Sequence, residues 1–205
     1  MKSFKQFLRE ASEDDISDQP VTVDVYHGSG KKFDQFEPKL AKLKNDFYGG
    51  GIGYFTDNKN IAKSYARSSS RDTKTPHLYH TTLTLHKPFD VDEVFSGDKL
   101  TKILPKKYDD LDQFARSAGL IKPGVDPYAA IANLQTGETQ LSGSQVFKGL
   151  SKGMTDTAKA RDHLIKNGYD GLRYNGGMNM QQATQHNVYI PYSMQSIKIN
   201  KRETL

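Results

Sequence analysis

Glycines and aromatic residues in three short segments constrain the fold of this chain more than any other feature. The segments are Val-Tyr-His-Gly-Ser-Gly at 25–30, Gly-Gly-Gly-Ile-Gly-Tyr-Phe-Thr-Asp at 49–57, and Ala-Lys-Ser-Tyr-Ala at 62–66. The first predicts a strand that ends in a His-Gly-Ser turn, because β-branched and aromatic residues favour strands. The second predicts a glycine-rich loop that leads into another strand, and the third lies on a predicted helix.

These residue types suit a pocket for a planar aromatic ligand. Glycine is needed where a ligand presses against the backbone, and Gly28 leaves an open N–H and C=O beside the imidazole of His27. Tyr54 and Tyr65 can sandwich an aromatic ring, at about 0.5–1.5 kcal/mol per stacked pair. Each element alone also fits a glycine-rich hairpin with core tyrosines and a surface histidine. The ordered combination favours the pocket.

The ordered set resembles the NAD-binding core of ADP-ribosyltransferases of the diphtheria-toxin and poly(ADP-ribose) polymerase type. That family carries a His-Gly-Ser/Thr, a Gly-x-Tyr-Phe-x-Asp strand and a second tyrosine at the same spacing. The resemblance implies that His27 binds a ribose hydroxyl of NAD and that the Gly28 backbone holds the nicotinamide amide. It also implies that Tyr54 and Tyr65 stack on the nicotinamide ring. The predicted NAD-binding set is His27, Gly28, Ser29, Tyr54, Phe55 and Tyr65.

The family's catalytic glutamate begins a strand near the C-terminus. Alignment without gaps on Gln195 places Asn187 at this position. Cleavage of the nicotinamide–ribose bond develops positive charge, which an amide stabilises less than a carboxylate, and one such group typically contributes about 10²–10³ in rate. The predicted catalytic set is His27, Tyr54 and Asn187. An enzyme with this set is not expected to build chains of ADP-ribose. A glutamate restored at 187 is expected to raise NAD cleavage.

The resemblance implies an α+β fold with two small, mostly antiparallel sheets around an NAD cleft and flanking helices. Alternation from Leu78 to Leu85 predicts a strand. Residues 162–167 followed by Gly168 predict a helix with a glycine cap and a strand after it. We expect one transferase-like domain at 21–205.

Residues 96–155 are predicted to form a helical insertion within this domain. Helices are expected from Leu111 to Ala118, closed by Gly119, and from Tyr128 to Leu134. The insertion either packs as helices alone or carries substrate-recognition loops around residues 136–140.

Residues 1–11 predict a short amphipathic helix, followed by an acidic linker at 12–20. This N-terminus resembles the leader of internal head proteins of T-even-like bacteriophages, whose prohead protease cuts after Leu/Ile-x-Glu. Leu8-Arg9-Glu10 matches that site. The resemblance implies cleavage after Glu10 and residence in the phage head interior, then in the host cytoplasm. The alternative is a terminal helix that docks on the domain.

Composition and charge limit the classes of protein to which this chain can belong. The 205 residues fit one domain and include no cysteine, which excludes disulfides and Cys-ligated zinc. No apolar run approaches the about 20 residues of a membrane span, so no membrane partner is expected. The net charge of +5 fits a solvated basic surface or a face for acidic partners. His77, His80 and His86 fall on different strand faces without a carboxylate, so no metal is expected.

The leading function is mono-ADP-ribosylation of a host protein or nucleic acid with NAD. The alternative is a catalytically degenerate transferase fold that acts as a non-enzymatic internal head or binding protein. RNA 2′-phosphotransferase chemistry is disfavoured, because the arginines such a phosphate pocket needs are scattered at Arg67, Arg71 and Arg173.

Overall fold

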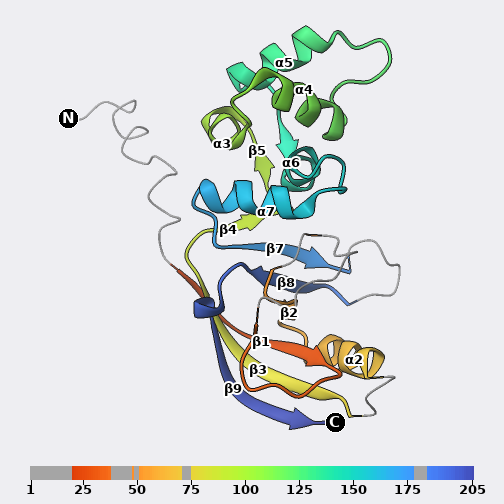
Figure 1. Cartoon of the computed structure of the whole chain (residues 1–205), viewed down its shortest axis with the longest axis vertical. Helices are drawn as coiled ribbons and strands as arrows, with labels where there is room; N and C mark the ends of the chain where they lie inside the picture. Colours follow the sequence, from red (N-terminus) through yellow and green to blue (C-terminus); the bar gives the residue numbers. More distant parts are fainter. Residues whose placement is uncertain (1–19, 38–47, 49–50, 71–74, 178–183) are drawn as a thin grey trace, which may run out of the picture.

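A seven-stranded sheet in the order β4-β7-β8-β2-β1-β3-β9 runs through the computed structural model (Figure 1). The structure describes residues 20–37, 48, 51–70, 75–177 and 184–205. The strands of this sheet are β1 (Val21–Ser29), β2 (Phe55–Thr56), β3 (His77–Leu85), β4 (Pro88–Asp90), β7 (Gly171–Gly176), β8 (His186–Pro191) and β9 (Ile197–Thr204). All neighbours pair antiparallel except β4 and β7. The predicted α+β class with mostly antiparallel strands is confirmed.

The short strand β2 joins the two halves of this sheet. It pairs with β1 through Tyr26↔Thr56, and with β8 through Phe55↔Tyr189 and Thr56↔Val188. The two small sheets expected from the sequence are therefore halves of one sheet. In the described part of the chain, pairing between β1 and β2 stops at Tyr26, so the edge of β1 from His27 to Ser29 carries no strand on that side.

The other half of the sheet is a regular antiparallel ladder. β1 and β3 pair over nine residues each, from Val21↔Leu85 to Ser29↔His77. Thr81, Leu83 and Leu85 are buried on one face, while Thr82 and Thr84 between them are partly exposed. This is the alternation that predicted the strand from Leu78 to Leu85, and that prediction is confirmed.

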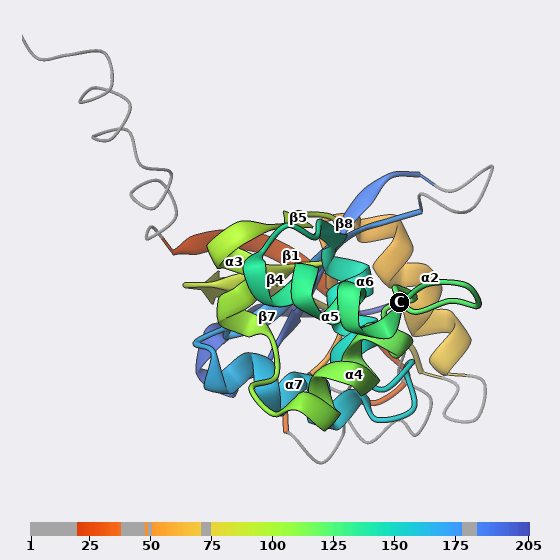
Figure 2. The ribbon, with the colours of Figure 1, turned by 90° about the horizontal axis from the view of Figure 1, so that it is seen from above.

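Helices gather at the β4 and β7 end of the molecule (Figures 1 and 2). They are α3 (Gly97–Ile103), α4 (Tyr108–Ser117), α5 (Pro127–Thr136), α6 (Gly143–Leu150) and α7 (Thr157–Lys166), with a two-stranded ribbon of β5 (Val94–Phe95) and β6 (Leu141–Ser142) among them. Phe114 and Phe147 of these helices share one core with Leu172 and Ile190 of the sheet. The helical region is thus continuous with the sheet's own core.

The helices predicted around 111–118, 128–134 and 162–167 are confirmed as α4, α5 and α7, although each begins earlier than predicted. Gly119 follows α4 with φ +82°, and Gly168 follows α7 with φ +83°, the left-handed conformation of helix-terminating glycines. α3 and α6 were not predicted. The α6 signal was a capping box, in which Ser142 and Gln145 satisfy each other's backbone N–H groups. The status of this region as a family-specific insertion stays a prediction.

Helix α2 (Lys59–Ser69) packs on β1 through its backbone. Asn58 caps its N-terminus by accepting the N–H groups of Asn60 and Ile61. Small side chains at Ala62 and Ala66 are buried against the strand. A Cβ at Gly28 would lie 1.9 Å from the Ala62 carbonyl oxygen and 2.7 Å from the Ala66 nitrogen. The helix therefore rests directly on a strand position that has no side chain.

The predicted leader at 1–10 and nearly all of the linker lie outside the described residues. Among the described residues, no helix is both long enough and apolar enough to cross a membrane.

We predict that Gly28→Ala lowers the free energy of unfolding by about 1–3 kcal/mol, because the methyl group must push α2 off β1. Urea unfolding measures this. Gly53→Ala is the matched control, since its Cβ would meet its nearest neighbour at an ordinary 3.5 Å. Equal stability of the two variants would contradict the close fit of α2 on Gly28.

Candidate functional site

The imidazole of His27 is held by one hydrogen bond and a ring of aromatic side chains. Its Nδ1 lies 2.8 Å from the carbonyl oxygen of Tyr54. Ring centroids of Phe36, Phe55 and Phe33 lie 5.1, 5.3 and 6.0 Å from that of His27. Because a carbonyl only accepts, Nδ1 carries the proton and donates it. In the neutral ring, Nε2 is then left as an acceptor.

This environment keeps His27 neutral. Burial among aromatic rings disfavours the imidazolium and lowers the His27 pKa from 6.5 to about 4. At neutral pH the ring is therefore a fixed tautomer, with Nε2 ready to accept a hydroxyl hydrogen. A neutral ring in this tautomer can accept a hydrogen bond from a ligand hydroxyl at Nε2.

Strand alternation separates the imidazole from helix α2. His27 and Gly28 are consecutive, so they face opposite sides of the sheet. The missing Cβ of Gly28 points at α2, which places the helix on the face opposite the imidazole. The missing Cβ of Gly53 lies 3.5 Å from the His27 ring, and Tyr54 is partly buried against the core cluster that contains Leu172 and Ile190.

The two predicted stacking tyrosines differ in exposure. Tyr65 lies on one flank of α2 and is 66% exposed. Lys59 lies on the other flank and pairs with Glu203 of β9 at 3.6 Å, so the Tyr65 flank faces away from β9. Tyr54 is partly buried against the core that the helices share with β7 and β8, and its carbonyl oxygen accepts the His27 hydrogen bond.

The other predicted NAD-binding residues have different surroundings. Gly28 makes room for α2, and its main chain lies on the open edge of β1. The Ser29 hydroxyl accepts the Lys31 N–H at 3.0 Å. Phe55 is fully buried, which corrects its predicted role. Its ring has no free face and instead supports His27 from within the core.

Asn187 is bound by a carboxylate that the sequence analysis did not assign. Its main-chain N–H donates to Asp57 Oδ1 at 2.9 Å, and its side-chain Nδ2 donates to Asp57 Oδ2 at 2.7 Å. The Asp57 N–H donates back to the Asn187 carbonyl at 3.3 Å. Asp57 is exposed. The available signal was the aspartate that closes the Gly-x-Tyr-Phe-x-Asp motif.

Asn187 shares a sheet face with His27. It lies two residues before Tyr189, so both project from the same side of β8. Tyr189 pairs with Phe55, and the Phe55 ring contacts His27. His27, Asn187 and the Asp57 carboxylate therefore belong to one surface that is centred on β2.

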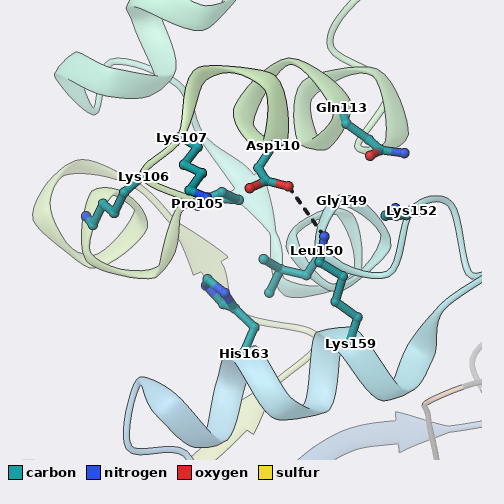
Figure 3. Close-up of a pocket in the computed structure, with 10 residues that line it drawn as sticks. All are labelled: Pro105, Lys106, Lys107, Asp110, Gln113, Gly149, Leu150, Lys152, Lys159 and His163. Atoms are coloured by element: carbon teal, nitrogen blue, oxygen red, sulfur yellow. Dashed lines mark hydrogen bonds and ion pairs between the residues drawn. The ribbon is translucent and has the colours of Figure 1, made fainter.

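A separate cavity of about 190 Å³ lies among the helices (Figure 3). Lys106, Lys107, Lys152 and Lys159 line it, and His163 donates to the Ile103 carbonyl beside it at 2.6 Å. Asp110 neutralises part of this charge through an ion pair with Lys159 at 3.4 Å. None of the predicted site residues lines this cavity. In the part of the chain that the structure describes, no three His, Asp or Glu side chains are grouped to hold a metal ion.

Comparison with known proteins gives one family. A family model described as ADP-ribosyltransferase in polyvalent proteins matches residues 19–204. No curated protein and no solved structure matches the chain.

We predict that the His27 ring stays neutral down to about pH 5, because its pKa is about 4. The unfolded chain binds this proton near pH 6.5, so stability falls as the pH drops from 6.5 to 4, by up to about 3 kcal/mol. NMR titration of the ring measures the pKa directly. His27→Gln, which keeps a donor for Tyr54 and does not titrate, should lose this part of the acid sensitivity. A His27 midpoint near 6.5 would contradict the buried neutral ring.

Proposed function

The chain belongs to the ADP-ribosyltransferases of polyvalent proteins, and we propose that it binds NAD and transfers single ADP-ribose units to a host macromolecule. The observation that carries this proposal is the fixed neutral tautomer of His27, whose Nε2 suits a ribose hydroxyl. The family match covers every predicted site residue.

The edge of β1 is the proposed NAD site. Within the described ranges the main chain from His27 to Ser29 has no strand partner toward β2, so it can hydrogen-bond the nicotinamide amide. Tyr65 is exposed on the flank of α2 that faces away from β9, and the Tyr54 carbonyl oxygen accepts the hydrogen bond of His27. These features fit a planar ring beside Gly28, bounded by two aromatic side chains.

The reaction breaks the bond between nicotinamide nitrogen and ribose C1′, and the electron pair leaves with nicotinamide. A lone pair of the acceptor forms the new bond at C1′, and the acceptor's proton passes to solvent. Positive charge grows on the ribose between these events. The protein's part is to orient the ribose through His27 and to surround C1′ with negative potential.

We predict that Tyr65→Ala weakens NAD binding roughly 2- to 10-fold through lost stacking alone. The fold should be unaffected, because this side chain is 66% exposed. Titration calorimetry with NAD measures the affinity. Tyr128→Ala is the matched control, a tyrosine on α5 that is 74% exposed. Equal affinities of the two variants would remove Tyr65 from the site.

Transfer itself is tested with labelled NAD and a host lysate. Label on a protein or nucleic acid supports the transferase and identifies the acceptor class. Binding of NAD with neither label transfer nor nicotinamide release would favour the non-enzymatic alternative. His27→Ala should abolish any labelling that the wild-type protein gives.

We further propose that the protein is packaged in a phage head and delivered into the host cytoplasm. The support is the basic amphipathic N-terminus with Leu8-Arg9-Glu10, which matches a prohead protease site. We predict that the protein in mature virions begins at Ala11, as N-terminal sequencing would show. An intact Met1 in virions would contradict the packaging proposal and leave the transferase proposal untouched.

A further inference from the structure

We propose that Asp57 is the carboxylate that stabilises the positive charge on the ribose and that Asn187 is its positioning residue. This inference rests on the proposed function, since it concerns the same NAD site. It assigns the charge of the missing glutamate to a residue 130 positions earlier in the chain.

The carboxylate of Asp57 lies directly beside the Asn187 amide. Glutamate is one methylene longer than asparagine, so a glutamate at 187 would carry its carboxylate about 1.5 Å beyond the Asn187 amide. Asp57 Oδ2 lies 2.7 Å from that amide nitrogen. The Asp57 carboxylate therefore lies close to where a glutamate at 187 would place its own. Asn187 and Asp57 together present one negative charge, as a single glutamate would.

Asp57 has acceptor sites that Asn187 does not fill. An ionised carboxylate has about four acceptor sites, and Asn187 fills one on each oxygen. The remaining sites belong to an exposed group that can accept ribose hydroxyls. Among the described residues, no lysine or arginine forms an ion pair with Asp57, so its charge is not neutralised locally. The nearby Arg173 is already paired with Asp90 at 2.7 Å.

Asn187 fixes the orientation of the Asp57 carboxylate. Two donors from one residue hold both Asp57 oxygens, which removes rotation about the carboxylate bond. Electrostatic stabilisation is strongest when the group is oriented before the charge develops. Asn187 thus acts through Asp57.

This arrangement reverses one expectation from the sequence. A glutamate at 187 would bring a second carboxylate against Asp57, and like charges at this distance raise the pKa of one of them. Asn187→Glu should therefore fail to raise NAD cleavage, because the site already holds its carboxylate.

The test compares Asp57→Asn with the exchanged pair Asp57→Asn/Asn187→Asp, which keeps one carboxylate and one amide in contact. Nicotinamide release, NAD affinity and thermal stability are measured for each. Asp170→Asn is the matched structural control, since Asp170 also accepts two N–H groups, from His86 at 2.6 Å and Lys87 at 3.0 Å.

We expect Asp57→Asn to lower nicotinamide release about 10²–10³-fold while NAD affinity changes only a few-fold. The exchanged pair should recover at least about tenfold of that loss, which a purely structural role for either residue would not produce. Asp170→Asn should lose stability and keep its rate.

Three outcomes would overturn the inference: a wild-type rate in Asp57→Asn, no recovery in the exchanged pair, or increased release in Asn187→Glu. A wild-type protein that binds NAD but releases no nicotinamide would also overturn it. A wild-type protein that does not bind NAD would instead overturn the proposed function, so the two failures are distinguishable.

Discussion

The absence of a side chain at Gly28 determines where the parts of the site lie. Backbone atoms of α2 at Ala62 and Ala66 rest on this strand position, so a side chain at residue 28 would displace the helix. The fit fixes the flank of α2 that carries Tyr65 and commits that face of β1 to the helix. The neighbouring residue His27 must then face the other side, where the aromatic cluster receives it. Gly28 thus fixes α2 on one face of β1 and the His27 ring on the other.

The aromatic cluster gives His27 its chemistry. Tyr79 is fully buried, stacks on Phe33 at 4.2 Å and accepts the Phe33 N–H at 2.8 Å, so it anchors the segment that closes over the imidazole. The apolar rings suppress the charged form, and the Tyr54 carbonyl selects the tautomer. A histidine on an open strand edge would titrate near neutral pH and would present either nitrogen. In this protein the surroundings of His27 determine both its protonation state and its tautomer without a ligand.

The sequence predicted what depends on local pattern. Alternation located β3, and glycines marked the ends of α4 and α7, because these signals come from neighbouring residues. The motif resemblance identified the family. Phe55 was misassigned because an aromatic residue in a motif looks the same whether it faces a ligand or the core. The Asp57–Asn187 contact was missed because it depends on the register of two strands that are 130 residues apart.

That register matters more for function than the residue at 187 alone. β2 is two residues long, yet its pairing with β8 decides which side chain meets Asn187. A slip of one residue would turn Asp57 away and bring a neutral neighbour in its place. An isolated comparison at 187 finds an amide where the resemblance implies a glutamate. The paired strands place a carboxylate and an amide together, so the charge that we propose for the site is a property of the strand pair.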